Sequence, residues 1–352
     1  MIGSDVQEAQ RVLLMGCGAV GGVIAGGWLR ARHQVAIVTH NEAITQAINS
    51  DGLRLTTPEG QWTLPATAHT SLEELSGTFD AAYLAMKATE VEQAARAVGD
   101  RLSDHGYVVT LQNGVVEDRV GNVLGRDRVV GALVGWGATM HAPGVYEMTS
   151  RGELVIGELD GRQTPRLERV KAILDAVAPA TLSTNIYGVL WSKLAINCTI
   201  TTLGAVTGQL LGKMLQRASI RRLGLAIVSE AVDVARSHDI ILEPVGGTLD
   251  LQRLYLTPNR RAGGLGLDVL TRHAIMLVVG LKFRRLKSSM LQSLERGRRC
   301  EIDFMNGYVV DRAQETGVPA PVNASLTAMV HQIEAGSRPI SPGNLRDLSP
   351  QA

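Results

Sequence analysis

The fold of this chain is decided near its start, by the stretch Val12-Leu13-Leu14-Met15-Gly16-Cys17-Gly18-Ala19-Val20-Gly21. The first four residues are apolar and predict a buried strand, and the next six match Gly-x-Gly-x-x-Gly at the start of a predicted helix. In that setting Gly16 allows a tight turn, Gly18 lets the backbone approach a diphosphate, and Gly21 lets the helix pack closely on the strand. The first N–H groups of the helix then face the phosphates. The stretch predicts a dinucleotide-binding turn, and a glycine-rich turn without a ligand is the alternative.

Strands and helices alternate on both sides of this turn up to about residue 135. Helices are expected over 19–30 and 91–102, and further buried strands over 34–39, 81–85, 107–111 and 129–134. This alternation predicts a parallel, doubly wound sheet. Two hairpins are also expected, one formed by residues 53–56 and 62–64, the other by residues 145–148 and 153–157.

From Arg166 onward the pattern is mostly helical. We therefore expect an α/β Rossmann-type NADP-binding domain over residues 11–184 and an all-α substrate and catalytic domain over residues 185–340. The end of the chain, residues 341–352, is rich in Pro, Gly, Ser and Asn and is expected to be an extended tail.

Composition narrows the class of protein. The chain has 352 residues, 45% of them hydrophobic and 20% charged, which is ordinary for a soluble globular protein of two domains. Aromatic residues make up 4% and the net charge is +1, so a nucleic-acid partner is not expected. Residues 1–180 hold 15 basic and 21 acidic residues, whereas residues 181–352 hold 20 and 13. The basic half would suit an anionic substrate, and two unrelated surfaces explain the split equally well.

The cysteines, the first residues and the uncharged stretches indicate in which compartment the protein is expected. Cys17, Cys198 and Cys300 are far apart and lack metal-ligand spacing, so a reducing cytoplasm and no metal site are expected. The first ten residues do not resemble a signal peptide. The longest uncharged stretch, 194–212, contains Asn197 and Gln209 and is interpreted as a buried helix rather than a membrane span.

The cofactor preference depends on the end of the second strand. Enzymes that prefer NAD usually carry an acidic residue there for the ribose hydroxyl. This chain has His40 and Asn41 at that place, and Glu42 comes just after it. We therefore expect NADPH, with His40 and Lys87 near its 2′-phosphate. A solvated loop histidine is the alternative for His40.

Two other groups of residues are candidates for the site. Asn113 follows a predicted strand at its carboxyl end, where ligands of open α/β sheets bind, although Asn-Gly is also an ordinary turn. Lys193 and Asn197 share one face of a predicted helix, and apolar surroundings would lower the pKa of Lys193 toward the range of a general acid. A helix lysine that reaches solvent is the alternative. Glu301 and Asp303 are candidate acids, and the pattern does not choose between them.

Taken together and in this order, these motifs resemble the ketopantoate reductase (2-dehydropantoate 2-reductase) family. The residues that carry the resemblance are the glycine turn, Gln112-Asn113-Gly114, Lys193 four residues before Asn197, and Ser288-Ser289-Met290 twelve residues before Glu301. It extends from about Val12 to Leu345. The resemblance implies a Rossmann domain joined to a helical domain, NADPH as cofactor, and the reduction of ketopantoate to pantoate for pantothenate and coenzyme A synthesis.

The resemblance also assigns roles. It implies that Lys193 and Glu301 are the catalytic residues, Lys193 as the general acid, and Glu301 as the acid that binds the hydroxyl side of the substrate and helps to position the reacting groups. Asn113 matches a position that contacts both substrate and cofactor, and Lys87 a lysine that recognises NADPH. Asn197, Thr201 and Ser289 match substrate-binding positions. Electrostatics agrees, because a positive lysine stabilises the charge that develops on the carbonyl oxygen.

Three departures from the family pattern stand out. His40 occupies a place where the family often has Arg, and Thr201 a place where many members have Asn. The segment of about residues 254–287 is longer than in compact members and basic, with Arg260, Arg261, Arg272, Lys282, Arg284 and Arg285. We interpret it as a lid or as the contact of a possible homodimer, with a solvated surface as the alternative. Reduction of another 2-oxo acid, or a non-catalytic NADPH-binding sensor, are the competing functions.

Overall fold

The computed structural model describes residues 10–244, 250–261 and 266–348. The chain divides into two compact units. The first comprises Met1–Gln112 and Val116–Ile186, and the second Asn113–Val115 and Tyr187–Ala352. The three residues 113–115 thus belong to the second unit although both of their flanks belong to the first.

The first unit is built on an eight-stranded sheet with the strand order β12-β11-β8-β7-β6-β1-β2-β5. Neighbouring strands are parallel except β11, which runs antiparallel to β8. The predicted doubly wound parallel sheet is confirmed for the six strands from β8 to β5 in this order, whereas β11 and β12 both run in the opposite direction. The strands are β1 (Val12–Met15), β2 (Val35–Val38), β5 (Ala68–His69), β6 (Phe79–Leu84), β7 (Leu102–Thr110), β8 (Val129–Val134), β11 (Leu154–Glu158) and β12 (Ala180–Leu182).

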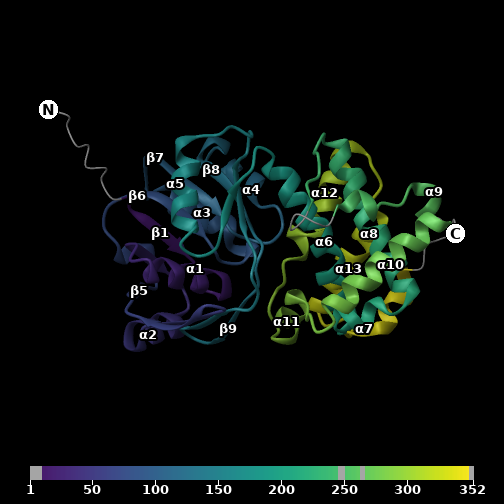
Figure 1. Ribbon diagram of the computed structural model, residues 1–352, viewed down its shortest axis with the longest axis horizontal. Helices are drawn as coiled ribbons and strands as arrows, with labels where there is room; N and C mark the ends of the chain where they lie inside the picture. The colour runs from purple at the N-terminus through teal and green to yellow at the C-terminus, as the bar shows by residue number, and fades with distance from the viewer. Residues whose placement is uncertain (1–9, 245–249, 262–265, 349–352) are drawn as a thin grey trace. The chain divides into compact units, whose positions relative to one another are not determined.

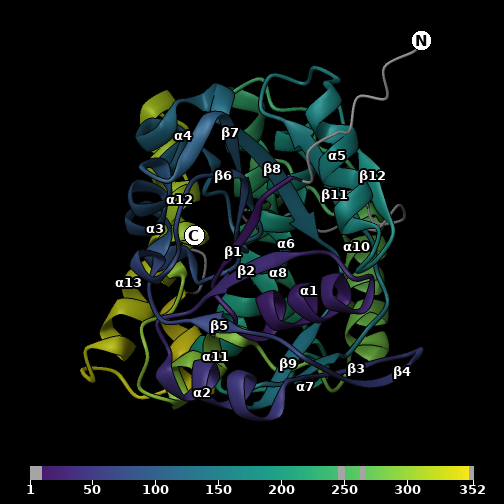
Figure 2. The same ribbon diagram turned by 90° about the vertical axis from the view of Figure 1, so that its left-hand side faces the viewer.

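Helices cover both faces of this sheet. Figure 2 shows α1 (Ala19–Arg30) and α5 (Pro165–Leu174) on one side, and α3 (Val91–Gly99) and α4 (Glu117–Leu124) on the other. The indole of Trp28 is fully buried between α1 and α5 and donates a hydrogen bond to the carbonyl oxygen of Ile173 at 2.8 Å. Helix α2 (Glu42–Asp51) follows β2, and three 3-10 helices lie within the described residues of this unit, η1 (Leu72–Glu74), η2 (Ala88–Glu90) and η3 (Arg126–Arg128).

The second sheet of the unit corrects one prediction. It has the order β4-β3-β10-β9, with β3 (Leu53–Thr57), β4 (Gly60–Leu64), β9 (Ala138–Ala142) and β10 (Val145–Met148). The hairpin of β3 and β4 is confirmed. The expected hairpin of residues 145–148 and 153–157 is wrong, because β10 pairs with β9 and β3 whereas β11 joins the large sheet.

A second correction concerns the helix expected over 91–102. It ends at Gly99, and Leu102 is the first residue of β7, where it pairs with Phe79. Leu102 is buried at 8% exposure, so its apolar side chain belongs to the sheet core rather than to a helix face.

The second unit is helical, as predicted (Figure 1). Its helices are α6 (Ile186–Thr207), α7 (Leu211–Leu215), α8 (Ala218–Ser237), α9 (Pro258–Arg261), α10 (Leu267–Lys282), α11 (Ser289–Glu295), α12 (Asn306–Thr316) and α13 (Pro321–Glu334). The described residues of this unit also form the 3-10 helices η4 (Leu251–Arg253), η5 (Ile302–Phe304) and η6 (Pro342–Leu348). Helices α8, α12 and α13 pack on one another.

The longest helix of the second unit, α6, is apolar and long enough to cross a membrane by length and composition alone. Its mean hydropathy is 1.3, and 72% of the window that passes this test is buried inside the protein. It therefore serves as a core helix here. It ends at Thr207, earlier than the uncharged stretch, because Gly208 takes a positive φ of 69°.

The expected extended tail is wrong for residues 342–348, which form η6. Asn344 is buried and donates hydrogen bonds to the carbonyl oxygens of Val206 at 3.1 Å and Pro339 at 2.8 Å. The bond to Val206 attaches this segment to the last turn of α6. Residues 349–352 of the expected tail lie outside the described residues.

Candidate functional site

The glycine turn joins β1 to α1 as predicted. Gly16 has a φ of +94°, and an added Cβ would lie 2.6 Å from the backbone nitrogen of Met86. Gly21 lies against Gly16, since a Cβ there would be 2.0 Å from its carbonyl oxygen. At Gly18, by contrast, a Cβ would meet nothing within 4 Å. The turn is closed by contacts at Gly16 and Gly21, and it is open at Gly18, where a diphosphate would approach.

The first turn of α1 has the properties of an anion site. Gly18 is its N-cap and supplies no side chain to accept from the first N–H groups. Those N–H groups carry the positive end of the helix dipole. Cys17, between the two glycines, is buried and keeps its thiol neutral, since burial raises its pKa to about 11. Ala19 and Val20 begin the helix and present only small or apolar side chains.

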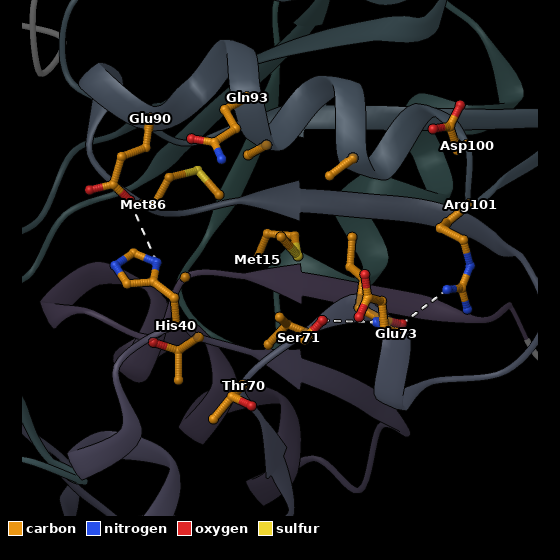
Figure 3. Close-up of a pocket in the computed structure, with 16 residues that line it drawn as sticks. Met15, His40, Thr70, Ser71, Glu73, Met86, Glu90, Gln93, Asp100 and Arg101 are labelled. Atoms are coloured by element: carbon orange, nitrogen blue, oxygen red, sulfur yellow. Dashed lines mark hydrogen bonds and ion pairs between the residues drawn. The ribbon is translucent and has the colours of Figure 1, made fainter.

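A cavity of about 730 Å³ opens beside this turn, within the first unit. It is lined by residues at the ends of three adjacent strands. These are Met15 and Gly16 at the end of β1, Thr39 and His40 after β2, and Met86 after β6. The chain crosses from one side of the sheet to the other at β1, and such a crossing is where open α/β sheets bind ligands. Figure 3 shows His40 and Glu90 at one end of the cavity and Asp100 and Arg101 at the other.

The charges in this cavity bear on the expected preference for NADPH. The exposed His40 has its Nδ1 atom 3.8 Å from the Oε2 atom of Glu90, a residue of the 3-10 helix that follows Lys87. Arg101 uses its guanidinium to donate to the carbonyl oxygens of Leu72 and Gly77. Lys87 is half-buried and lies outside the set of residues that line the cavity. Sequence reasoning missed Glu90, which approaches His40 from another strand's loop.

The loop that carries Asn113 is held from both sides. Gln112 is buried and donates to the carbonyl oxygens of Leu84 at 2.9 Å and Met86 at 3.3 Å. On the other side the buried Glu117 accepts from Thr110 at 2.7 Å and from the backbone N–H of Val116 at 2.9 Å. Burial raises the pKa of Glu117 to about 7. Sequence reasoning passed over Glu117, although its place directly after an apolar run was a signal of burial.

Asn113 itself, which is half-buried, lies in the second unit. The following residue, Gly114, has a φ of +93°, and an added Cβ would be 2.3 Å from the carbonyl oxygen of Phe304. Only glycine is compatible with both that conformation and that approach. Because Phe304 follows Glu301 by three residues, the Asn113-Gly114 turn is placed next to the segment that carries this acid.

Lys193 and Asn197 lie one turn apart on α6, as expected. Lys193 is half-buried, and loss of hydration lowers its pKa to about 8. The charge of Glu301 acts in the opposite direction and raises the pKa of the lysine. A lysine with such a pKa exchanges its proton near neutral pH, which an ordinary solvated lysine does not. The structure thus brings Lys193 and Glu301 together.

The second candidate acid, Asp303, is engaged elsewhere. Its Oδ1 atom lies 2.8 Å from the Nε2 atom of His331 on α13. His331 also contacts Glu334 at 3.2 Å. Of the two acids that the sequence left open, Glu301 is therefore the one that acts on Lys193.

Ser288 and Ser289 lie next to α6 at Thr201, which is two turns beyond Lys193. The buried Ser288 donates to the carbonyl oxygen of Thr201 at 2.6 Å and accepts from the backbone N–H of Leu291 at 3.0 Å, as the N-cap of α11. Ser289 is exposed and begins that helix. Thr201, two turns after Lys193, is buried. The expected substrate residues Asn197, Thr201 and Ser289 thus lie along one helix and its immediate neighbour.

A buried polar network supports this arrangement, and no motif in the sequence predicts it. Asn306 is fully buried, accepts from Thr202 at 2.5 Å, and donates to the carbonyl oxygen of Cys198 at 3.2 Å. Asn306 also donates to the side-chain oxygen of Asn323 at 2.9 Å, and Asn323 donates to the buried carboxylate of Glu230 at 2.8 Å. The network joins α6, α8, α12 and α13 around the residues that follow Glu301.

Two family models match the chain in sequence. Residues 12–161 match Ketopantoate reductase PanE/ApbA, and residues 185–334 match its C-terminal part. A crystal structure of the PanE/ApbA family ketopantoate reductase from Ralstonia eutropha is 30% identical, covers 93% of this chain and 99% of its own, and has a TM-score of 0.76. This chain belongs to the ketopantoate reductase family.

Further proteins that are similar to this chain agree with this assignment. The 2-dehydropantoate 2-reductases of Mesorhizobium japonicum and Pyrococcus horikoshii are 28% and 26% identical, each over 92% of this chain and over 97% and 98% of their own lengths. A D-mandelate dehydrogenase solved with NADH shares the fold at 19% identity, with a TM-score of 0.78 over 93% of this chain and 99% of its own. Membership of the family makes the protein an oxidoreductase by class.

Proposed function

We propose that this protein reduces 2-dehydropantoate to pantoate with NADPH. The observation that carries the proposal is Lys193, a half-buried lysine of α6 whose pKa of about 8 is set by burial and by Glu301. Names of relatives that cover nearly the whole chain support the substrate. A non-catalytic sensor has no use for a proton donor with this pKa, so catalysis is favoured over that alternative.

The residues of the first unit fit a nicotinamide dinucleotide. The turn of Gly16, Cys17, Gly18, Ala19, Val20 and Gly21 would hold the diphosphate, and the adjoining cavity at the end of β2 would hold the adenosine half. His40 would face the 2′-phosphate, with Lys87 as a further positive charge. When bound, the nicotinamide supplies the hydride that reaches the C2 carbonyl of the substrate.

The residues of the second unit would do the remaining chemistry. Protonated Lys193 donates a hydrogen bond from Nζ to the carbonyl oxygen, stabilises the negative charge that develops there, and gives up its proton. Glu301 keeps the lysine protonated and binds the hydroxyl side of the substrate. Glu301 also helps to position the reacting groups, and Asn113 contacts both the substrate and the cofactor. Asn197, Thr201 and Ser289 bind the substrate, with Ser289 near the carboxylate.

The structure also favours one alternative substrate class. Thr201 is shorter than the asparagine that many family members have at this place, and it is buried while Ser288 holds its carbonyl oxygen. A shorter side chain changes the space and the hydrogen bonds offered to the substrate. Another 2-oxo acid is therefore the second candidate. A place in cytoplasmic pantothenate and coenzyme A synthesis follows only if the substrate is 2-dehydropantoate.

A single assay separates these functions. The oxidation of NADPH would be followed in the presence of 2-dehydropantoate and, in parallel, of a panel of 2-oxo acids that differ in size beyond C3. We expect the highest kcat/KM with 2-dehydropantoate. Turnover of another acid with none of 2-dehydropantoate would select the second candidate, and NADPH binding without turnover of any acid would select the sensor.

A further inference from the structure

Two glycines of α1, Gly22 and Gly26, lie one turn apart on the side of the helix that faces the second sheet of the first unit. An added Cβ at Gly26 would lie 3.0 Å from the side chain of Leu53 and 2.9 Å from that of Leu55, both on β3. At Gly22 it would lie 2.2 Å from the ring of Tyr146 on β10. Because neither glycine has a side chain, this sheet packs directly against α1 (Figure 2).

The close packing brings the hydroxyl of Tyr146 to the glycine turn. Tyr146 is fully buried, and its hydroxyl donates a hydrogen bond to the carbonyl oxygen of Cys17 at 2.9 Å. The same hydroxyl lies 3.4 Å from the Sγ atom of Cys17. A thiol sulfur is a weak acceptor, so the backbone carbonyl is the principal partner of this hydroxyl. A residue of the second sheet thus holds one peptide unit of the turn.

This hydrogen bond also sets the direction of the next N–H group. The carbonyl of Cys17 and the N–H of Gly18 belong to one peptide unit, and in a planar trans peptide the two groups point in opposite directions. The described residues contain no cis peptide bond. Since Tyr146 holds the carbonyl on the buried side, the N–H of Gly18 points away from the buried ring. Gly18 is also the place at which the turn is open.

The direction of the Gly18 N–H matters because Gly18 is the N-cap of α1. The first N–H groups of a helix lack partners within it and attract anions. If the peptide between Cys17 and Gly18 turned over, it would present a carbonyl oxygen to a bound diphosphate in place of a donor. A contact that prevents this rearrangement raises affinity by organising the site before the ligand binds.

We propose that Tyr146 is a positioning residue for cofactor binding: its hydroxyl holds the Cys17–Gly18 peptide so that the Gly18 N–H is offered to the diphosphate. The inference rests on the proposed function, because it takes the ligand to be a nicotinamide dinucleotide. The second sheet thereby takes part in cofactor binding through Tyr146.

The first test compares three ligands by isothermal titration calorimetry on the full chain. They are NADPH, NADH and adenosine 2′-phosphate, which lacks the diphosphate. Tyr146→Phe removes the hydroxyl and keeps the ring that packs on Gly22. We expect the Kd of both dinucleotides to rise by the same factor, roughly fivefold, as for the loss of one hydrogen bond. The Kd of adenosine 2′-phosphate should not change.

Tyr83→Phe is the matched control for this test. Tyr83 is a fully buried tyrosine of β6 in the same unit, and its hydroxyl has no hydrogen-bond partner among the described residues. This variant should bind all three ligands as wild type does. Melting temperatures of both variants check that they are folded.

Two results would overturn the inference and leave the proposed function in place. One is an unchanged Kd of NADPH in Tyr146→Phe. The other is an equal loss of affinity for adenosine 2′-phosphate, which would indicate damage to the whole unit rather than an effect at the diphosphate. If wild type bound neither dinucleotide, the proposed function would fail and the inference would fail with it.

The second test observes the peptide itself and begins with wild type. Cys17-Gly18 is the only Cys-Gly pair of the chain. Protein labelled with ¹³C at the cysteine carbonyls and ¹⁵N in glycine therefore gives one carbonyl-edited NMR signal, that of the Gly18 amide. NADPH should shift this signal, whereas adenosine 2′-phosphate should not, and Tyr146→Phe should shift or broaden it before any ligand is added. A signal that stays unchanged in saturating NADPH would overturn the assigned direction of the Gly18 N–H.

Discussion

The side-chain amide of Asn306 donates a hydrogen bond to the Oδ1 atom of Asn323 at 2.9 Å, with both residues fully buried. Asn306 begins α12 five residues after Glu301, and its remaining hydrogen bonds go to Thr202 and Cys198 of α6. The helix that carries Lys193 and the segment that carries Glu301 are therefore connected through a single buried amide. Loss of the Asn306 amide should therefore shift both Lys193 and Glu301, although none of these hydrogen bonds of Asn306 goes to either residue.

Asn306→Ala should destabilise the protein and slow it. The substitution leaves Thr202 and Asn323 without their buried partner, which costs about 3 kcal/mol in the free energy of unfolding. We also expect kcat to fall while the Kd for NADPH stays nearly the same, because the glycine turn and the cavity that would hold most of the dinucleotide belong to the other unit. Urea unfolding and steady-state kinetics measure the two effects. Ser325→Ala, which removes an exposed hydroxyl on α13, is the control, and an equal effect of both variants would remove the special role of Asn306.

Lys193→Ala should lower kcat by roughly 10²- to 10⁴-fold, the range in which a general acid contributes. Binding of NADPH, followed by its fluorescence, should be nearly unchanged. Lys213→Ala on α7, an exposed lysine of the same unit, should leave both quantities as they are. Equal losses of turnover and NADPH binding in the Lys193 variant would contradict the role of a proton donor.

The pH dependence follows from the same lysine. Lys193 must be protonated to act, and its pKa is lowered to about 8. The value of kcat/KM for reduction should therefore be constant below that pH and fall as the pH rises through about 8. Because Glu301 raises the pKa of Lys193, Glu301→Gln should move the fall to lower pH in addition to reducing the rate. A profile that is flat up to pH 10 would exclude this lysine as the titrating group.

The preference between NADPH and NADH should respond to His40 and Glu90. His40→Arg adds a permanent charge that suits a phosphate, and Glu90→Gln removes the carboxylate that lies 3.8 Å from His40. Each variant should lower the Kd for NADPH more than that for NADH. If the ratio of the two constants does not move in either variant, this end of the cavity does not hold the 2′-phosphate.

Glu117 should make stability depend on pH. Burial raises its pKa from 4.5 to about 7, so the folded state holds this proton more tightly than the unfolded chain does. Its stabilising contribution is complete below pH 4.5 and is lost as the pH rises through 7. Between these limits the loss is of the order of 3 kcal/mol, at 1.36 kcal/mol for each pKa unit. Urea unfolding of wild type and Glu117→Gln at pH 5 and 8 should show a smaller change for the variant.

Features that depend on neighbours in the sequence were predictable. The strand, turn and helix from Val12 to Arg30 follow from apolar pattern and glycine spacing, both of which are local, and the structure confirms them. Lys193 and Asn197 share a helix face for the same reason. The roles of the individual site residues stay predictions.

Features that depend on distant parts of the chain were not predictable. Strand β10 pairs with β3, about ninety residues earlier, and no signal near residue 145 indicates this partner. The choice between Glu301 and Asp303 was open for a similar reason, because His331 engages Asp303 from α13. Glu90 meets His40 only once β2 and β6 are placed in the sheet.

Residues 113–115 matter for chimeras that combine the first unit of one family member with the second unit of another. They are flanked by residues of the first unit but grouped with the second, where Gly114 lies against the carbonyl of Phe304. A chimera joined only near Ile186 would separate this turn from the Phe304 segment against which it packs. Recombination that keeps a working enzyme should therefore carry the triplet together with the helical half, so inheritance of the two halves is not modular along the sequence.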